Sequence, residues 1–426
     1  MFGIILIGSF LLLIILNVPI AVSLGVSSII GLWYSDLSLD VVAPTVYSAI
    51  NKFSLLAIPF FILAGLIMEK GGISSRLVAF AQKIMGGLKS GLALTTVLVS
   101  VIFAAISGSG PATVAALGVI LIPAMINQGY ERGMAGALLS SSGSLGIIIP
   151  PSVAFIIYAS LTQESVSDMF IAGVLPGLIL AFILVVCSYF LIKNNSNIVA
   201  SERSSFKEII IAFKNAAWGL MAPVIILGGI YSGIFTPTES AGVAVVYGLF
   251  VGIYVYKEIS IKEIIEVLTD AATSTAVVMY IVAFATLFAW LLTTSLLAQD
   301  MADGIISITD DKILVLLLLN FVFLISGFFL DTISAYFILI PIILPVATSF
   351  DINPIHLGVF MTINLAVGQF TPPVGVNLFV ASNIGKIPIQ ELLKYIIPYI
   401  FASLIAVLII TYIPWLSLWL PSLIGD

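Results

Sequence analysis

The sequence predicts an all-α polytopic membrane protein made of two related halves that cross the bilayer in opposite directions. Three observations support this prediction. Hydrophobic residues make up 61 % of the 426 residues and charged residues only 8 %, whereas a soluble domain carries about 25 % charged residues. Apolar runs of about 20 residues, the length of a membrane-spanning helix, recur along the whole chain. The prolines and glycines of the first half also recur in the second half at one constant spacing.

Composition excludes several other classes of protein. A single cysteine, Cys187, excludes a disulfide framework and a multi-thiolate metal site, and a single histidine, His356, excludes zinc chemistry of the usual kind. The net charge is −6 without any basic stripe, which argues against a nucleic-acid partner. Residues 1–51 contain no Lys or Arg, so they lack the positive region of a signal peptide. The first apolar segment is therefore expected to stay in the lipid bilayer.

We interpret ten segments as membrane spans. Residues 2–34 hold the first two, split by Asn17 and Pro19, although one long tilted helix also fits this run. Two further apolar stretches, 91–128 and 313–349, carry a polar, glycine-containing break at the middle, and we interpret both as re-entrant hairpins. Lipid leaves exposed backbone unsatisfied, so these tips must be buried in protein or line a wet cavity. The spans lie near residues 2–16, 18–34, 53–69, 133–163, 169–192, 216–233, 237–256, 271–297, 354–385 and 395–420.

The distribution of basic residues favours this topology. With both hairpins re-entrant, 13 of the 15 basic residues fall on one side of the membrane, and only Lys52 and Lys312 fall on the other. Cytoplasmic segments are rich in Lys and Arg, so the crowded side is cytoplasmic and both termini are periplasmic. Counting either hairpin as a complete span would reverse the predicted membrane orientation of every segment that follows it.

The two halves align at an offset of 222 residues, the difference between 372 and 150. At this offset Pro150-Pro151 matches Pro372-Pro373, and the order of spans, hairpin and broken span repeats. Inverted repeats with broken helices are typical of secondary transporters, whose binding site lies where the repeats meet. The predicted parts are a first repeat 1–193 with hairpin 91–128 and broken span 133–163, a cytoplasmic linker 194–215, and a second repeat 216–426 with hairpin 313–349 and broken span 354–385.

The segment 71–90 joins a span to the first hairpin. Ile73, Leu77, Phe80 and Ile84 recur there at helical spacing, with basic residues between them. This pattern predicts an interfacial helix along the cytoplasmic leaflet, with a solvated loop as the alternative.

Four polar breaks, two in each half, are the candidate binding sites. Unwound backbone exposes carbonyl oxygens, and Ser, Thr and Asn add further hard oxygen ligands, which suit sodium. Sodium is the only metal expected, at two sites or more. The N-termini of half-helices at the same breaks suit a carboxylate. The alternative is that these small residues only allow close helix packing, which explains any one such motif but explains four in matched pairs less easily. The sodium candidates are Ser107, Gly108, Ser109, Ser141, Gly143, Gly327, Asp331, Thr332, Asn364, Gly368 and Thr371. The substrate candidates are Ser109, Pro111, Ser144, Pro150, Ser334, Thr371 and Pro372.

Two carboxylates stand out in this apolar chain. Asp331 lies at the tip of the second hairpin, where an intramembrane acid indicates a functional group that completes or gates a cation site. Glu239 lies just inside a helix that starts with Pro237, which favours a structural role at the helix N-terminus. His356 follows Asn353-Pro354 at the start of a span and is expected at an aqueous boundary.

Several motifs resemble one known family. The runs at 58–65 (IPFFILAG), 107–109 (SGS), 235–239 (FTPTE) and 371–375 (TPPVG) are similar, in the same order, to the large membrane subunit of tripartite ATP-independent periplasmic (TRAP) transporters. The resemblance covers essentially the whole chain.

The resemblance implies more than the residues do. Members of this family import carboxylates such as sialic acids or C4-dicarboxylates across the bacterial inner membrane, driven by a sodium gradient and by an elevator movement. It also implies two partners, a periplasmic substrate-binding protein and a separate small membrane subunit of four spans. The main alternative is a stand-alone sodium/carboxylate symporter of related fold. An intramembrane hydrolase would need a base for Ser109, which nothing in the sequence marks, and a passive channel fits occluded tips less well.

The topology predicts the side from which two positions are accessible. A cysteine replacing Ser204 should react with an impermeant thiol reagent only from the cytoplasm, and one replacing Gly304 only from the periplasm, because the basic segments mark the cytoplasmic face. The measurement is labelling of oriented vesicles or intact cells. Reaction of both positions from the same side would contradict the re-entrant topology.

Overall fold

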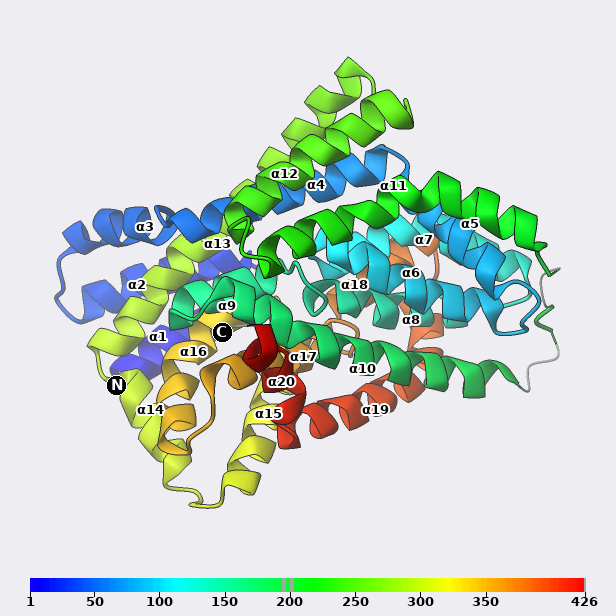
Figure 1. The fold of residues 1–426 in the computed structure, drawn as a ribbon. Helices are drawn as coiled ribbons and strands as arrows, with labels where there is room; N and C mark the ends of the chain where they lie inside the picture. Colours follow the sequence, from blue (N-terminus) through cyan, green and yellow to red (C-terminus); the bar gives the residue numbers. More distant parts are fainter. Residues whose placement is uncertain (194–196, 200–202, 425–426) are drawn as a thin grey trace.

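The computed structural model describes residues 1–193, 197–199 and 203–424, and all regular structure among them is helical (Figure 1). Nine helical segments of the described residues are long and apolar enough to cross a membrane. Three of these are α7 (Gly110–Asn127), α15 (Lys312–Phe329) and α16 (Thr332–Ser349), which are arms of the predicted hairpins, so length alone does not separate a re-entrant arm from a span.

The helices are α1 (Phe2–Ile15), α2 (Ile20–Tyr34), α3 (Val42–Ile50), α4 (Ala57–Lys70), α5 (Ile73–Met85), α6 (Gly91–Ser107), α7 (Gly110–Asn127), α8 (Arg132–Gly143), α9 (Val153–Thr162), α10 (Val166–Lys193), α11 (Phe206–Tyr231), α12 (Pro237–Phe250), α13 (Ile261–Thr294), α14 (Leu297–Ile306), α15 (Lys312–Phe329), α16 (Thr332–Ser349), α17 (Pro354–Gly368), α18 (Val376–Gly385), α19 (Ile389–Tyr412) and α20 (Trp415–Ile424). Short 3-10 segments η1 (Leu39–Val41), η2 (Phe53–Leu56) and η3 (Ser144–Ile147) and a π-helical turn η4 (Val251–Val255) complete the regular structure of the described residues.

The helix order of the first half recurs in the second at the offset found in the sequence. Helix α7 covers 110–127 and α16 covers 332–349, which coincide at an offset of 222 residues. The pairs α5 and α14, α6 and α15, α8 and α17, α9 and α18, and α10 and α19 match within three residues. The peptide bonds Pro150-Pro151 and Pro372-Pro373 are both cis. The duplication of helix order is therefore visible, whereas the opposite orientation of the halves in the bilayer stays a prediction.

The first apolar run forms two helices rather than one long one. Asn17 adopts a left-handed conformation (φ 61°), which asparagine tolerates better than most residues, and Pro19 precedes α2. Helices α1 and α2 then pack against each other, with Leu6 of α1 next to Gly31 of α2. Each is 14 or 15 residues long, which is short for a membrane span of about 20 residues.

The helices differ from three of the predicted segments because of caps and a break. Helix α11 begins at Phe206, inside the predicted linker, where Ser205 and Glu208 form a capping box. Ser260 and Glu263 form the same motif and start α13 ten residues before the predicted span. The predicted last span divides before Pro414 into α19 and α20. The linker positions 194–196 and 200–202 lie outside the described residues.

The broken spans form the most buried part of the molecule. Every residue from Gly133 to Gly143 of α8 is buried, as is every residue from His356 to Gly368 of α17. Helices α4, α11 and α12 lie along one side of the molecule and α10 and α19 along the other (Figure 1). The polar breaks in α8 and α17 are therefore buried in protein.

The segment predicted as an interfacial helix is helix α5, but its apolar face packs mainly on protein. Ile73 and Leu77 are buried and contact α11 at Gly219, and Phe80 packs against Phe213 with ring centroids 5.5 Å apart. Because α11 covers this face, α5 bridges the first hairpin and the second half of the chain.

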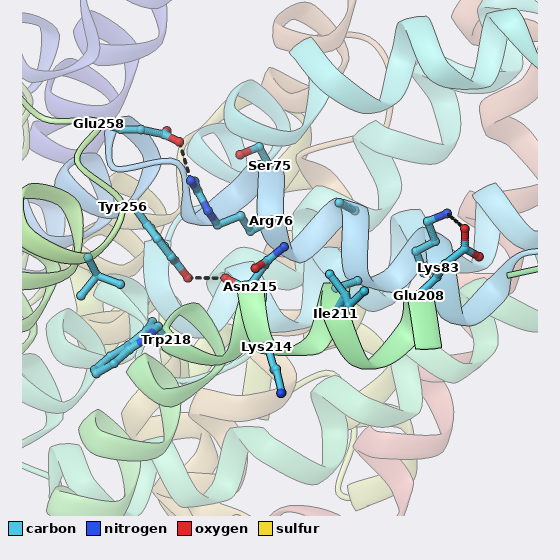
Figure 2. Close-up of a pocket in the computed structure, with 13 residues that line it drawn as sticks. Ser75, Arg76, Lys83, Glu208, Ile211, Lys214, Asn215, Trp218, Tyr256 and Glu258 are labelled. Atoms are coloured by element: carbon cyan, nitrogen blue, oxygen red, sulfur yellow. Dashed lines mark hydrogen bonds and ion pairs between the residues drawn. The ribbon is translucent and has the colours of Figure 1, made fainter. Parts of the chain in front are cut away.

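A groove of about 860 Å³ separates the polar faces of α5 and α11 (Figure 2). At one end Arg76 forms an ion pair with Glu258 at 2.7 Å and lies 3.8 Å above the ring of Tyr256. At the other end Lys83 and Glu208 approach to 3.6 Å. These contacts tie α5 to both α11 and the segment after η4. The groove contains none of the predicted site residues.

The backbone contact between Gly327 of α15 and Gly368 of α17 predicts a change in stability. A β-carbon at Gly368 would overlap the backbone of Gly327, so Gly368→Ala should destabilise the fold by about 1–3 kcal/mol, the usual cost of overpacking. The measurement is the melting temperature of the purified protein. The matched control is Gly228→Ala on α11, where an added β-carbon meets nothing within 4 Å. Equal melting temperatures for both variants would contradict this interpretation.

Candidate functional site

A cavity of about 280 Å³ lies between the two hairpin tips, bounded on the outer side by α4 and α13. Both broken spans contribute to its wall, through Ile147, Val153 and Gln369. Its lining combines a mainly apolar surface with a few polar groups, which is usual for a small-molecule site. The polar residues of the lining are Glu69, Ser107, Ser109, Ser274, Asp331, Thr332 and Gln369.

The first hairpin tip gathers oxygen atoms. Gly108 ends α6 with a positive φ of 59°, and Ser109 caps α7 in extended conformation. This turn brings the Ser107 hydroxyl within 2.7 Å of Thr113 Oγ1, which donates to the Ser109 carbonyl at 2.8 Å. A β-carbon at Gly146 would overlap this carbonyl, so the first broken span approaches the same cluster. Two hydroxyls and a carbonyl are hard oxygen ligands of the kind that sodium prefers.

The second hairpin tip is organised by Asp331. Its carboxylate caps α16 and accepts hydrogen bonds from the amides of Ile333 and Ser334 at 3.0 and 3.1 Å. The Ser334 hydroxyl donates to the other carboxylate oxygen at 2.5 Å. Thr332 Oγ1 accepts from Gln369 Nε2 at 3.2 Å, which links the tip to the second broken span. The Asp331 charge is therefore stabilised by the N-terminus of its own helix while the residue lines the cavity.

Of the predicted site residues, the structure brings one group together in this cavity and places the rest elsewhere. In the first half, Ser141 and Ser144 are buried and donate to the Leu138 and Ser141 carbonyls at 2.9 and 2.7 Å, and Gly143 packs against Val114. These three residues stabilise the break itself. The group in the cavity is Ser107, Gly108, Ser109, Pro111, Asp331 and Thr332.

Predicted substrate residue Pro150 lies apart from the cavity. It lines a separate apolar cavity of about 270 Å³ between α6, α10 and α11. In the second half, Thr371 donates to the Val367 carbonyl at 2.7 Å, next to Pro372, and neither residue lines the central cavity. The backbones of Gly327 and Gly368 are in contact. The Ser334 hydroxyl donates a hydrogen bond to Asp331, and Ser334 does not line the cavity.

Asn364, a predicted sodium ligand, belongs to a different polar cluster. Its amide donates to Asn320 Oδ1 at 2.6 Å and to the Phe360 carbonyl at 2.8 Å, and Thr411 donates to the same Asn320 oxygen at 3.0 Å. The two asparagines line an apolar cavity of about 680 Å³ between α15 and α19. The cluster therefore joins α15, α17 and α19 and lies apart from the hairpin tips.

Three residues of the site were not predicted as ligands. Thr113 follows Ser109 by one helical turn, so its spacing carried a signal that the two hydroxyls share a face. Gln369 adjoins Gly368 and is buried, with an Oε1 atom that has no partner among the described residues. Glu69 lies next to the basic residue Lys70 at the end of an apolar run, where it resembled a boundary charge. Only tertiary packing brings it to the cavity.

Two further predictions are settled by hydrogen bonds. The structural role of Glu239 is confirmed, because it forms a capping box with Thr236 at the start of α12. The boundary position of His356 was wrong: the side chain is 2 % exposed, and its ring nitrogens lie 3.2 Å from Ser417 Oγ and 3.1 Å from the Thr411 carbonyl. Helix α20 folds back over the start of α17 and covers the ring.

Comparison with known proteins identifies the family. Residues 7–416 match the profile of the tripartite ATP-independent periplasmic transporter, DctM component. The chain belongs to this family. It is 42 % identical to the C4-dicarboxylate TRAP transporter large permease protein DctM of Pseudomonas aeruginosa, covering 95 % of this chain and 94 % of that protein. It is 36 % identical to the sialic acid TRAP transporter large permease protein SiaM of Vibrio cholerae, covering 91 % of each.

A third relative is longer than this chain. The isethionate TRAP transporter permease protein DctMQ of Oleidesulfovibrio alaskensis is 40 % identical over 96 % of this chain, which spans 65 % of that protein's length. The TRAP large permeases are transporter subunits rather than enzymes, so the hydrolase alternative is discarded and the chain is a multi-pass membrane protein.

Solved structures of similar fold come from more distant transporters. The YdaH transporter of Alcanivorax borkumensis aligns with a TM-score of 0.66 at 17 % identity, over 88 % of each chain. MtrF of Neisseria gonorrhoeae aligns with a TM-score of 0.57 at 14 % identity, over 88 % of this chain and 83 % of that one. At this identity the likeness establishes the transporter fold alone.

The oxygen cluster at the first tip predicts a defect in cation binding. Ser107→Ala and Thr113→Val remove one hydroxyl each while nearly keeping size, so both variants should fold but need more sodium for the same rise in melting temperature. The measurement is a sodium titration of thermal stability in detergent, with Ser274→Ala, a cavity hydroxyl outside the cluster, as the control. Superimposable titrations for all variants would indicate that the cluster only packs the tip.

Proposed function

We propose that this chain is the large membrane subunit of a sodium-gradient-driven secondary transporter that imports carboxylates of the C4-dicarboxylate or sialic acid class. The observation that carries the proposal is the cavity between two helix-capped hairpin tips, in a chain of the TRAP transporter family. The relatives named for C4-dicarboxylates and sialic acid support this choice of substrate class.

Sodium coupling is supported by the oxygen atoms at the tips. The cluster of Ser107, Thr113 and the Ser109 carbonyl offers one site. The carboxylate and hydroxyls near Asp331 and Thr332 offer a second region of hard ligands, so two sodium ions or more are proposed.

Carboxylate binding is supported by the electrostatics of the same tips. Helix α7 begins at the cavity, and a helix N-terminus carries free amides and a partial positive charge that attract anions. The N-terminus of α16 is already capped by the Asp331 carboxylate, which leaves that of α7 for the substrate. The described lining contains no Lys, Arg or His, so helix ends, the Ser109 hydroxyl and bound sodium supply the positive charge. Substrate binding would then require sodium, which is the physical basis of the proposed coupling.

The transport movement and the partners follow from the same proposal. The hairpins and broken spans would move as one body against a scaffold of the remaining helices, in an elevator mechanism within the bacterial inner membrane. The two halves would have opposite orientations, with both termini periplasmic. A periplasmic substrate-binding protein would deliver the carboxylate, and a separate small membrane subunit of four spans would complete the scaffold.

A stand-alone sodium/carboxylate symporter is the second candidate. The fold, which is similar to those of YdaH and MtrF, is compatible with this alternative. Reconstitution distinguishes the two: sodium-driven uptake by this chain alone favours the symporter, whereas uptake that requires a cognate binding protein and small subunit supports the proposal.

The role of Asp331 gives the sharpest test of sodium coupling. Asp331→Asn keeps a good helix cap but removes the charge, so the variant should fold and yet take up substrate weakly, with a higher sodium requirement. The measurement is uptake against sodium concentration in proteoliposomes with both partners. The matched control is Asp311→Asn, which also caps a helix (α15) but lies outside the cavity. Overlapping curves for wild type and Asp331→Asn would make Asp331 only a helix cap.

A further inference from the structure

Two hydroxyl groups of the cavity have a hydrogen available to a ligand, one at each hairpin tip. The Ser109 oxygen accepts a hydrogen bond from the Ala112 amide at 3.5 Å, and the Thr332 oxygen accepts one from Gln369 Nε2 at 3.2 Å. A hydroxyl carries a single hydrogen, and neither of these hydrogens has an acceptor among the described residues. Both residues line the cavity, so each tip presents one hydroxyl donor to the same space.

The other hydroxyl groups of the tips use their hydrogens within the protein. Ser107 and Thr113 form a hydroxyl pair at 2.7 Å, and Thr113 also donates to a carbonyl oxygen of the first tip. At the second tip the Ser334 hydroxyl donates to the Asp331 carboxylate at 2.5 Å. These hydroxyls therefore hold the tips in shape, whereas the two described above are directed toward an occupant.

Gln369 determines how the Thr332 hydroxyl is used. An amide nitrogen only donates, so the Thr332 oxygen must accept from it and its own hydrogen points elsewhere. The Gln369 side chain is 6 % exposed and follows the end of α17. Its Oε1 end lies beside the first tip, where a β-carbon added at Gly110 would overlap it. The amide is thus buried between the two tips, and this packing restricts its rotation.

We propose that Gln369 is a positioning residue of the substrate site, which orients the Thr332 hydroxyl so that Thr332 and Ser109 donate to the same substrate carboxylate. The inference rests on the proposed function and keeps its substrate class. It assigns Thr332 to the substrate and leaves the Asp331 carboxylate as the cation ligand of the second tip. Hydrogen bonds to a carboxylate are charge-assisted and strong, so one carboxylate bound by both tips would hold them together.

The test is a double-mutant cycle on Gln369 and Thr332, measured by calorimetric titration of the purified full chain at saturating sodium. The probes are succinate and N-acetylneuraminate, one for each proposed substrate class, and the probe that wild type binds more tightly is used for the variants. Thr332→Val should weaken its binding by about 10-fold, the loss expected for one hydrogen bond to a charged group. Gln369→Met should weaken it by about 3- to 10-fold in wild type but by less than about 2-fold in Thr332→Val, because Gln369 acts through that hydroxyl.

Two further variants make the cycle independent of a packing defect. Gln369→Glu is isosteric but accepts the Thr332 hydrogen instead of donating to its oxygen, so it should weaken binding by at least as much as Gln369→Met. Gln390→Met replaces an exposed glutamine of α19 and should leave binding unchanged. Equal losses from the Gln369 variants with and without the Thr332 hydroxyl would overturn the inference and make Gln369 a packing residue only.

A sodium titration of the melting temperature without substrate separates this inference from the proposed function. Thr332→Val should give the wild-type titration, and a higher sodium requirement would overturn the inference by making Thr332 a sodium ligand. Failure of wild type to bind either acid in sodium would refute the proposed substrate class and the inference with it. Additive losses in a protein that binds one of the acids would refute the role of Gln369 alone.

Discussion

The structure depends on the contact between each hairpin tip and the broken helix of the same half. A helix that stops inside an apolar environment leaves amides and carbonyls without partners, and lipid cannot supply them. In the first half the Gly108 carbonyl accepts from the Val153 amide at 3.3 Å, across the break. In the second half Gly327 lies directly against Gly368, where no side chain fits between the two backbones. Because the tips and the breaks cover each other, the irregular backbone is buried in protein.

The same contacts determine the electrostatics of the cavity. A tip that ends one helix and starts the next aims an N-terminus at the space between the halves, and the caps Ser109 and Asp331 fix where each helix begins. The first tip therefore presents a partial positive charge without any basic side chain, whereas at the second tip the Asp331 carboxylate offsets that of α16. Glu69 of α4 adds a carboxylate to the lining besides Asp331. This polarity follows from backbone geometry as much as from residue type.

The ion pairs in the groove between α5 and α11 are partly exposed, and they connect neighbouring segments rather than form a binding site. Arg76 and Glu258 have side chains 25 % and 42 % exposed, so their ion pair contributes about 0–1 kcal/mol to stability. Burial of Ile73 and Leu77 against α11 contributes more, at about 1.5–3 kcal/mol for each fully buried side chain. The link between α5 and α11 is thus held mainly by apolar packing, and the polar contacts in the groove orient it.

The sequence by itself determined the helical membrane class, the duplication and the position of both tips. These depend on local signals: apolar length, glycine and proline at breaks, and the offset that relates Pro150-Pro151 to Pro372-Pro373. Helix starts at Phe206 and Ile261 also had a local signal, the capping box, which an apolar-length criterion overlooks. What only the tertiary structure decided is which polar residues share a cavity. Asn364 and Glu69 have equally polar side chains in apolar runs, yet the first joins a distant amide cluster and the second faces the tips. That difference arises from how helices far apart in the chain pack, and the spacing of residues along one helix carries no information about its neighbours.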